Sequence, residues 1–191
     1  IRLPMPKALR PAAILPETLG RIGALEVRLA ATPREVKKAQ KLRYKVFYEE
    51  MSAIPDVQAQ LSRRDRDGFD KICDHLLVID HDTRLASGEA AIVGTYRLLR
   101  QEVANRHTGF YTANEFDIGS LLERHSGLNF LELGRSCVLK PYRTKRTLEL
   151  LWHGIWSHVR SHGIDVMVGC ASLEGANPDA LSLPLSFLHH S

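Results

Sequence analysis

The sequence predicts an α/β domain of the α+β type, with helices on both faces of a mixed, mostly antiparallel sheet. Two observations predict this fold class. The apolar segments 75–80 and 90–100 flank a polar stretch and are typical of a hairpin. Over 130–171, a buried strand, a long amphipathic helix and another buried strand follow one another. The 191 residues suit one domain with a sizeable core.

Composition narrows the function classes. Hydrophobic residues make up 44% of the chain and charged residues 25%, as in ordinary globular proteins. No segment reaches the roughly 18 uninterrupted apolar residues of a membrane-spanning helix. Three widely spaced cysteines argue against a disulfide framework. They predict a reducing, cytoplasmic location, and peripheral contact with the inner face of the membrane stays open.

The formal charge of +4 is concentrated in two places. Residues 7–45 are rich in Lys and Arg, and residues 137–147 carry basic side chains and no acidic one. Such patches suit an acidic protein, a phosphate or an acidic lipid, although a solvated face explains the N-terminal patch equally well. Few aromatic residues interleave with these charges, so we expect no nucleic-acid partner.

The first elements follow from local signals. Residues 1–24 contain four prolines and predict an extended or partly ordered arm, which leaves 25–191 as the domain. Residues 26–30 predict a first strand. Thr32-Pro-Arg-Glu35 then forms a capping box with proline at the first helical position. This motif predicts a helix that runs to about Met51.

Two arginines lie on faces that are predicted to be buried. Arg43 falls within the apolar stripe of the first helix, and Arg97 shares a face with apolar residues of the 90–100 strand. A buried arginine needs a partner, and three acidic residues cluster nearby: Asp65, Asp67 and Asp70. We expect these groups to meet, as a structural salt bridge or as organisers of a site. The cluster lacks the ligand spacing of a calcium loop, so no metal is expected.

The later elements complete the domain. Residues 54–66 are predicted as a loop with a short helix, residues 81–89 as the hairpin loop, and residues 118–123 as a short helix. A long helix over 145–162 ends at Gly163. Its expected buried side consists of Leu148, Leu151, Trp152, Ile155, Trp156 and Val159.

The strand before this long helix is apolar apart from Glu132 and Arg135. A glutamate in a buried strand is costly unless it is paired or functional, and a carboxylate in a dry site suits a general base. Simple alternation places Glu132 and Arg135 on opposite faces. A bulge at Gly134 would bring them together; otherwise we expect Arg135 to pair with Asp67 or Asp70.

The turn after that strand is basic. At the start of the helix, backbone N–H groups and the helix dipole favour a phosphate. The side chains expected to bind it are Arg143, Thr144, Lys145 and Arg146. A carboxylate on the strand and a phosphate site on the next helix describe a site for an amine and a phosphate-bearing acyl donor. No permanently bound cofactor is expected.

The order of elements and this strand–turn–helix resemble the GNAT superfamily of N-acyltransferases. The resemblance implies that the strands over 130–139 and 165–171 splay apart to form the cleft for the acyl donor. The usual signature, Arg-x-x-Gly-x-Gly, cradles the pyrophosphate of coenzyme A. Here the stretch Arg143-Thr-Lys-Arg-Thr-Leu148 lacks both glycines. The departure favours acyl carrier protein over coenzyme A as the donor.

Two narrower families that use acyl carrier protein resemble the chain. The pattern of the acyl-homoserine-lactone synthases is matched by Arg43, Phe47, Asp67, Asp70, Arg97, Glu132 and Arg135. The closer resemblance is to the ornithine-acyl-carrier-protein N-acyltransferases, also called hemolysin-like, from about Arg28 to the end. It is carried by the segments 42–51, 69–76, 94–99, 109–111, 131–138 and 169–172.

This resemblance implies transfer of a (3-hydroxy)fatty acyl group from the phosphopantetheine thioester of acyl carrier protein to the α-amine of ornithine, giving lyso-ornithine lipid. It implies Glu132 as the base and a backbone oxyanion site near Gly134 and Ser136. The acyl chain would enter a tunnel lined in part by Trp152 and Trp156, unless both belong to the core. The expected site-organising residues are Arg43, Phe47, Asp67, Asp70, Arg97 and Arg135.

Other functions stay open from the sequence. They are homoserine-lactone synthesis, acetylation of a small amine from acetyl-CoA, and a non-catalytic protein that binds carrier protein or lipid. Relatives continue past the motif at 183–190. We therefore expect either a fragment truncated at the C-terminus or a domain that lacks a C-terminal part of the site.

Overall fold

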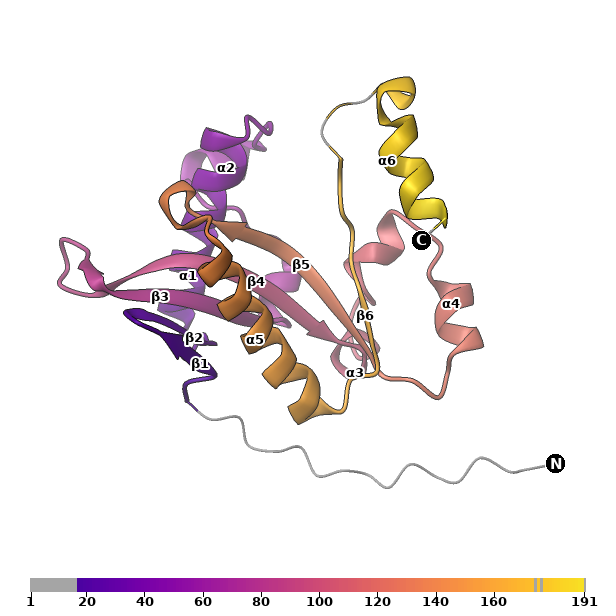
Figure 1. The fold of residues 1–191 in the computed structure, drawn as a ribbon, viewed down its shortest axis with the longest axis horizontal. Coiled ribbons are helices and arrows are strands. Elements are labelled where there is room, and N and C mark those ends of the chain that lie inside the picture. Colours follow the sequence, from indigo (N-terminus) through magenta and orange to yellow (C-terminus); the bar gives the residue numbers. More distant parts are fainter. Residues whose placement is uncertain (1–16, 174, 176, 191) are drawn as a thin grey trace.

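The centre of the protein is a six-stranded sheet with the order β1-β2-β3-β4-β5-β6 (Figure 1). The computed structural model describes residues 17–173, 175 and 177–190. All neighbouring strands are antiparallel except β5 and β6, which are parallel. The strands are β1 (Gly20–Ile22), β2 (Leu25–Leu29), β3 (Asp74–Arg84), β4 (Ala90–Arg100), β5 (Phe130–Val138) and β6 (Val166–Val168). The predicted mixed, mostly antiparallel sheet is confirmed.

Helices connect these strands and cover the sheet. The α-helices are α1 (Pro33–Tyr44), α2 (Val57–Ser62), α3 (Gln101–Ala104), α4 (Gly119–Arg124), α5 (Lys145–His162) and α6 (Pro178–His190). A π-helical segment, η1 (Lys45–Glu50), continues α1. Short 3-10 helices are η2 (Gly68–Lys71), η3 (Tyr111–Asn114) and η4 (Lys140–Tyr142).

Several predicted boundaries agree with these elements, and others are wrong. The strand at 90–100, the helix at 145–162 and its end at Gly163, with φ 61°, are confirmed. β3 continues to Arg84, which pairs with Ala90, so the hairpin loop is shorter than the predicted 81–89. Residues 20–22, within the predicted arm, form β1. Most of the arm, residues 1–16, lies outside the described residues.

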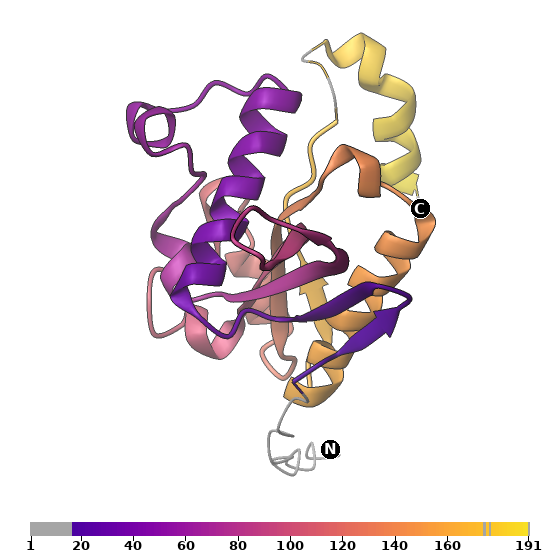
Figure 2. The same cartoon turned by 90° about the vertical axis from the view of Figure 1, so that its left-hand side faces the viewer.

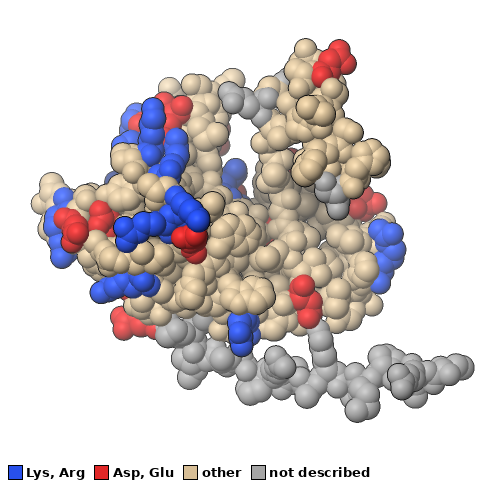
Figure 3. Space-filling model, viewed as in Figure 1, with Lys and Arg blue, Asp and Glu red and all other residues tan. Residues whose placement is uncertain are grey.

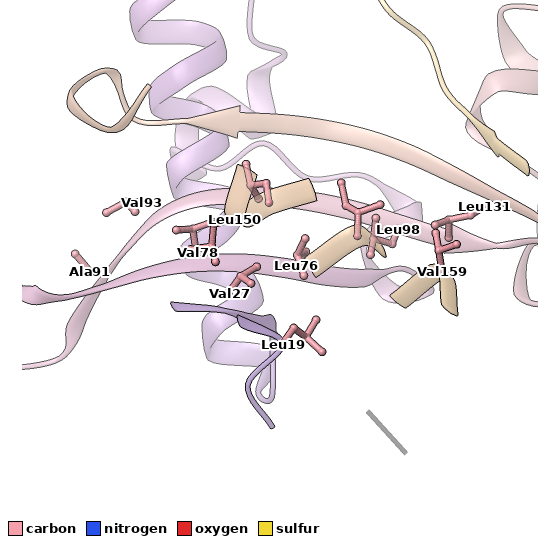
Figure 4. Close-up of a cluster of buried hydrophobic side chains, with 12 residues drawn as sticks. Leu19, Val27, Leu76, Val78, Ala91, Val93, Leu98, Leu131, Leu150 and Val159 are labelled. Atoms are coloured by element: carbon pink, nitrogen blue, oxygen red, sulfur yellow. The ribbon is translucent and has the colours of Figure 1, made fainter. Parts of the chain in front are cut away.

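The two long helices pack on opposite faces of the sheet, with α1 on one side and α5 on the other (Figure 2). Ala39 of α1 packs against Leu77 and Ile79 of β3. On the other face, Leu150 and Val159 of α5 join side chains from the strands in the main core cluster (Figure 4). Because β3 is covered on both sides, its central residues are apolar without alternation.

The buried face of α5 differs from the prediction. Leu148, Trp152 and Trp156 are exposed, and the helix meets the sheet through Thr147, Leu150, Leu151, Gly154, Ile155, His158 and Val159. Gly154 explains this rotation of the helix. A methyl group built on it would lie 2.8 Å from Val27 Cγ2, so the helix approaches the sheet along its smallest residue. The large apolar side chains therefore point away from the core.

We predict that Gly154→Ala destabilises the fold although alanine is the better helix former. Overpacking against Val27 and Leu76 costs roughly 1–3 kcal/mol, whereas helix propensity returns at most about 1 kcal/mol. Urea unfolding measures the difference. Gly127→Ala is the matched control, because its added methyl group meets nothing within 4 Å. Equal stabilities of the two variants would contradict this account of the α5 packing.

Candidate functional site

A buried network of arginines and aspartates joins α1 to the segment before β3. Arg43 of α1 is 1% exposed. Its Nη1 and Nη2 atoms donate to the two carboxylate oxygens of Asp70, both at 2.8 Å, and its Nε lies 2.8 Å from Asp65 Oδ2. Gln40 adds a donor to Asp70 at 3.0 Å. The guanidinium thus binds Asp70 through two parallel hydrogen bonds, a fork geometry that lysine could not reproduce.

Arg97 of β4 enters the same network from the sheet. Its Nη1 donates to Asp67 Oδ1 at 2.6 Å and to Asp70 Oδ1 at 3.3 Å. The predicted meeting of Arg43 and Arg97 with the aspartates is confirmed. Burial raises the pKa of Asp70, but Arg43 and Arg97 outweigh it and hold that pKa below its usual range. Asp70 is therefore ionised near neutral pH.

A β-bulge in β5 brings a third arginine to this cluster. Thr95 of β4 pairs with Cys137, but Arg97 pairs with Gly134, so β5 carries one extra residue between these pairs. Arg135 lies in the bulge with φ 51°, in the left-handed region. The expected bulge is confirmed, although the unusual φ falls on the arginine and not on the glycine.

Arg135 also makes the expected ion pair, in a different combination. It lies 3.5 Å from Asp65 and 3.6 Å from Asp67, and its guanidinium stacks over Tyr111 at 5.6 Å from the ring centre. Pairing with Asp67 is confirmed, and Asp65 takes the place expected of Asp70, whose oxygens are used by Arg43 and Arg97. From the sequence, the bulge and the ion pair were alternatives; the structure contains both.

Glu132 is buried, at 5% exposure, and holds the segment that begins η3. One of its oxygens, Oε1, accepts from the backbone N–H and the hydroxyl of Thr112, both at 2.6 Å. The other, Oε2, accepts from the N–H of Tyr111 at 2.9 Å. A carboxylate offers about four lone-pair positions, so one remains on Oε2.

A small cavity lies where β5 and β6 separate. The ladder between these strands ends at the pair Glu132↔Val168, and beyond it the chain after β6 runs away from β5 (Figure 1). β6 is accordingly shorter than the predicted 165–171 strand. The cavity measures about 150 Å³ and is lined by Cys73, Arg97, Leu99, Tyr111, Thr112, Glu115, Glu132, Leu133, Gly134, Arg135, Cys170 and Ser172.

Two of the thiols near this site are poor nucleophiles. Burial raises the pKa of Cys73 to about 12, and burial raises the pKa of Cys137 to about 12. Both thiols therefore stay protonated near neutral pH, and neither is an activated nucleophile. In the part of the chain that the structure describes, no group of three or more His, Cys, Asp or Glu is placed to hold a metal ion.

A protein-family model matches more than half of the chain. The family model described as "Acetyltransferase (GNAT) domain" matches residues 42–153, which include the end of α1 with Arg43, the Arg–Asp network, the bulge and the first half of α5. The chain belongs to this family. The structure of FeeM, an N-acyl amino acid synthase from uncultured soil microbes, shares its fold, with a TM-score of 0.54, 12% identity, and coverage of 83% of this chain and 75% of that one.

The chain is also similar to two further proteins. The AHL synthase LasI shares the fold, with a TM-score of 0.50, 15% identity, and coverage of 86% of this chain and 77% of that one. The L-ornithine N(alpha)-acyltransferase of Agrobacterium fabrum is 56% identical over 172 residues, which are 90% of this chain and 58% of that protein. The chain thus spans less than two thirds of the length of this curated relative.

The basic turn of this GNAT domain differs from the expected phosphate cradle. Arg143 is already engaged, because its Nη2 donates to Glu50 at 2.5 Å and its Nε to the Val138 carbonyl at 2.9 Å. Thr144 caps α5 through its hydroxyl. Lys145 and Arg146 are exposed at the start of α5, where basic side chains gather on one face (Figure 3). They are the residues of the turn best placed for an anionic ligand.

The remaining predicted residues lie outside the lining of the cavity. Phe47 packs in a cluster with Leu42 and Val46 on the α1 face, and Ser136 is exposed on the bulge. Trp152 and Trp156, at 46% and 56% exposure, belong neither to the core nor to the lining of the cavity. The core interpretation of the tryptophans is therefore wrong, and an acyl tunnel lined by them stays a prediction.

Sequence reasoning missed Tyr111, Thr112 and Glu115 as parts of the site. Tyr111 and Thr112 contact Glu132 largely through backbone N–H groups, which leave no residue-type signal. Glu115 contacts only the hydroxyl of Tyr111 among these residues. The segments 109–111 and 169–172 did carry a signal, because they contributed to the family resemblance. From the sequence alone they were not assigned to the site. The structure puts both segments beside the cavity.

We predict that Arg43→Met lowers the free energy of unfolding by roughly 3–5 kcal/mol, because it removes the nearest cation of buried Asp65 and the two-point partner of buried Asp70. Arg34→Met is the matched control, since Arg34 is 72% exposed and its ion pair with Glu89 is solvated. Urea unfolding should place the control near wild type. Comparable losses in both variants would mean that the buried network has no special weight.

Proposed function

We propose that this chain carries out N-acyl transfer from a thioester donor to the α-amine of ornithine, giving lyso-ornithine lipid. The observation that carries the proposal is the cavity at the β5–β6 separation, with buried Glu132 and the bulge at Arg135 on one wall. The acceptor is supported by the 56% identity to a protein named for ornithine Nα-acylation. The thioester donor is supported by membership of the GNAT family.

The free lone pair of Glu132 Oε2 gives this residue its role in the proposal. The carboxylate accepts a proton from the ammonium of the acceptor, directly or through a water. The amine then attacks the thioester carbonyl, so the C–N bond forms, the C–S bond breaks, and the thiolate leaves and takes up a proton. The extra residue of a bulge leaves the ladder locally unpaired, so a backbone N–H near Gly134–Ser136 is available for the oxyanion.

For the donor we propose the phosphopantetheine arm of acyl carrier protein. The turn lacks the two glycines that would let the backbone approach a pyrophosphate closely, which weakens the case for coenzyme A. Lys145 and Arg146 present positive charge at the start of α5, where a phosphate and an acidic carrier would both be attracted.

We further propose a cytoplasmic location with peripheral contact at the membrane, because the product is a lipid. Leu148, Trp152 and Trp156 form an exposed apolar stripe on α5, and tryptophan side chains suit the boundary between water and lipid. Across the described ranges, no helix combines the length and apolarity required to cross a bilayer.

We predict that Glu132→Gln reduces kcat for acyl transfer to ornithine by about 10²–10⁴-fold. The deficit should shrink as the pH rises past about 8, where the free amine forms without a base. Steady-state kinetics across pH measures both effects.

Thr112→Val is the control for this variant, because it removes one hydrogen bond to Glu132 and keeps the carboxylate. If Glu132 only positions the segment before η3, the two variants should lose similar activity with the same pH profile. A base role requires the larger, pH-dependent loss in Glu132→Gln alone, with roughly tenfold or less in Thr112→Val.

We predict that the double variant Lys145→Glu/Arg146→Glu raises the KM for acyl carrier protein by roughly tenfold or more and leaves the KM for ornithine unchanged. The effect should fade with added salt, since the charges are exposed. Arg160→Glu, exposed near the other end of α5, is the matched control. Equal increases for carrier protein and ornithine would contradict docking at this turn.

A further inference from the structure

We propose that Arg135 and Glu115 bind the two charged ends of the acceptor amino acid, Arg135 its α-carboxylate and Glu115 its distal ammonium. The inference rests on the proposed function and deepens it, because it assigns the residues that select a diamino acid. Both side chains line the small cavity that contains Glu132.

Arg135 is the arginine of the buried network with donors to spare. Arg43 and Arg97 are 1% and 5% exposed and make hydrogen bonds of 2.6–2.8 Å to their aspartates. The Arg135 side chain is 32% exposed, and its carboxylate contacts, at 3.5 and 3.6 Å, are longer than an ordinary hydrogen bond. A planar guanidinium with such loose contacts can take up a carboxylate at the cavity wall.

The backbone at Arg135 supports a ligand-binding role. A left-handed φ is uncommon for a residue with a side chain and is held only where the surroundings impose it. Without the bulge, alternation would turn Arg135 to the face of the sheet opposite Glu132. The bulge places both on the wall of one cavity, with a cation three positions from the proposed base.

Tyr111 ties the three charged groups together. Its N–H donates to Glu132 at 2.9 Å, its hydroxyl donates to Glu115 Oε1 at 2.7 Å, and its ring lies under the guanidinium of Arg135. The hydrogen bond that Tyr111 donates to Glu115, together with burial, raises the pKa of Tyr111, so this hydroxyl remains a donor near neutral pH. One residue, through its backbone and its rigid side chain, therefore contacts the base, the cation and the second carboxylate.

These charges match a small diamino acid. Glu132 meets the α-amine, Arg135 the carboxylate and Glu115 the second amine. A cavity of about 150 Å³ is below the roughly 300–1,000 Å³ of pockets for drug-sized ligands and suits an acceptor of amino-acid size. A simple diamine offers nothing to Arg135, and a monoamino acid offers no ammonium to Glu115.

Three acceptors test this assignment: ornithine, 1,4-diaminobutane, which lacks the carboxylate, and norvaline, which lacks the distal amine. We measure Kd by calorimetry and KM and kcat by acyl transfer. Arg135→Gln should weaken ornithine and norvaline by roughly 10–100-fold and leave diaminobutane unchanged, since the lost contact is a charged hydrogen bond. Glu115→Gln should weaken ornithine and diaminobutane to a similar degree and leave norvaline unchanged.

Glu123→Gln and Arg124→Gln, on α4 and outside the cavity lining, are the matched controls and should behave as wild type. An equal loss for all three acceptors in either site variant, or a wild type that binds none of them, would overturn the assignment. The calorimetry separates this inference from the proposed function. Binding with the expected pattern but without any acyl product would retain the acceptor site and reject the acyltransferase proposal.

Discussion

The carboxylate of Asp70 is the contact on which the arrangement of the site depends. It accepts from Gln40 and Arg43 of α1 and from Arg97 of β4, and so fixes η2 between the helix and the sheet. Each of these groups would be costly to bury alone, and their mutual compensation makes the cluster tolerable. Because both oxygens of Asp70 are used, Arg135 pairs with Asp65 and Asp67, at the longer distances of 3.5 and 3.6 Å.

The bulge in β5 connects this Arg–Asp network to the cavity. A regular strand would present Glu132 and Arg135 to opposite faces, and the cavity would then hold a carboxylate without a neighbouring cation. With the extra residue, β5 carries a proposed base and a proposed carboxylate-binding group on one wall. The same irregularity leaves the ladder to β4 locally unpaired beside the separation of β5 and β6. The separation of β5 and β6 therefore creates the cavity, and the bulge places charged side chains on its wall.

Much of the fold could be predicted because its signals are local. Thr32 and Glu35 mark the start of α1, and Gly163 marks the end of α5. The network was predictable because buried arginines require acidic partners, and the cluster at 65–70 is the acidic run that lies between the two elements carrying Arg43 and Arg97.

The failures have a physical cause as well. On α5 apolar residues occupy more than half of the circumference, so hydrophobicity cannot decide which side is buried. Gly154 decides it, through the closeness of Val27 and Leu76, and that is a tertiary fact. The hold of Glu132 on Tyr111 and Thr112 depends on backbone donors, which every residue except proline possesses. Roles for the site residues could therefore be proposed only once the geometry was known.

The most direct measurement for the central claim is the identity of the product. Purified protein is incubated with ornithine and a mixed pool of acyl carrier protein thioesters, and tandem mass spectrometry locates the new amide. The account predicts a fatty acyl group on the α-nitrogen, because Arg135 and Glu115 would hold the distal amine away from Glu132. Acylation of the distal nitrogen, a homoserine lactone formed on adding S-adenosylmethionine, or transfer from acetyl-CoA alone would contradict it.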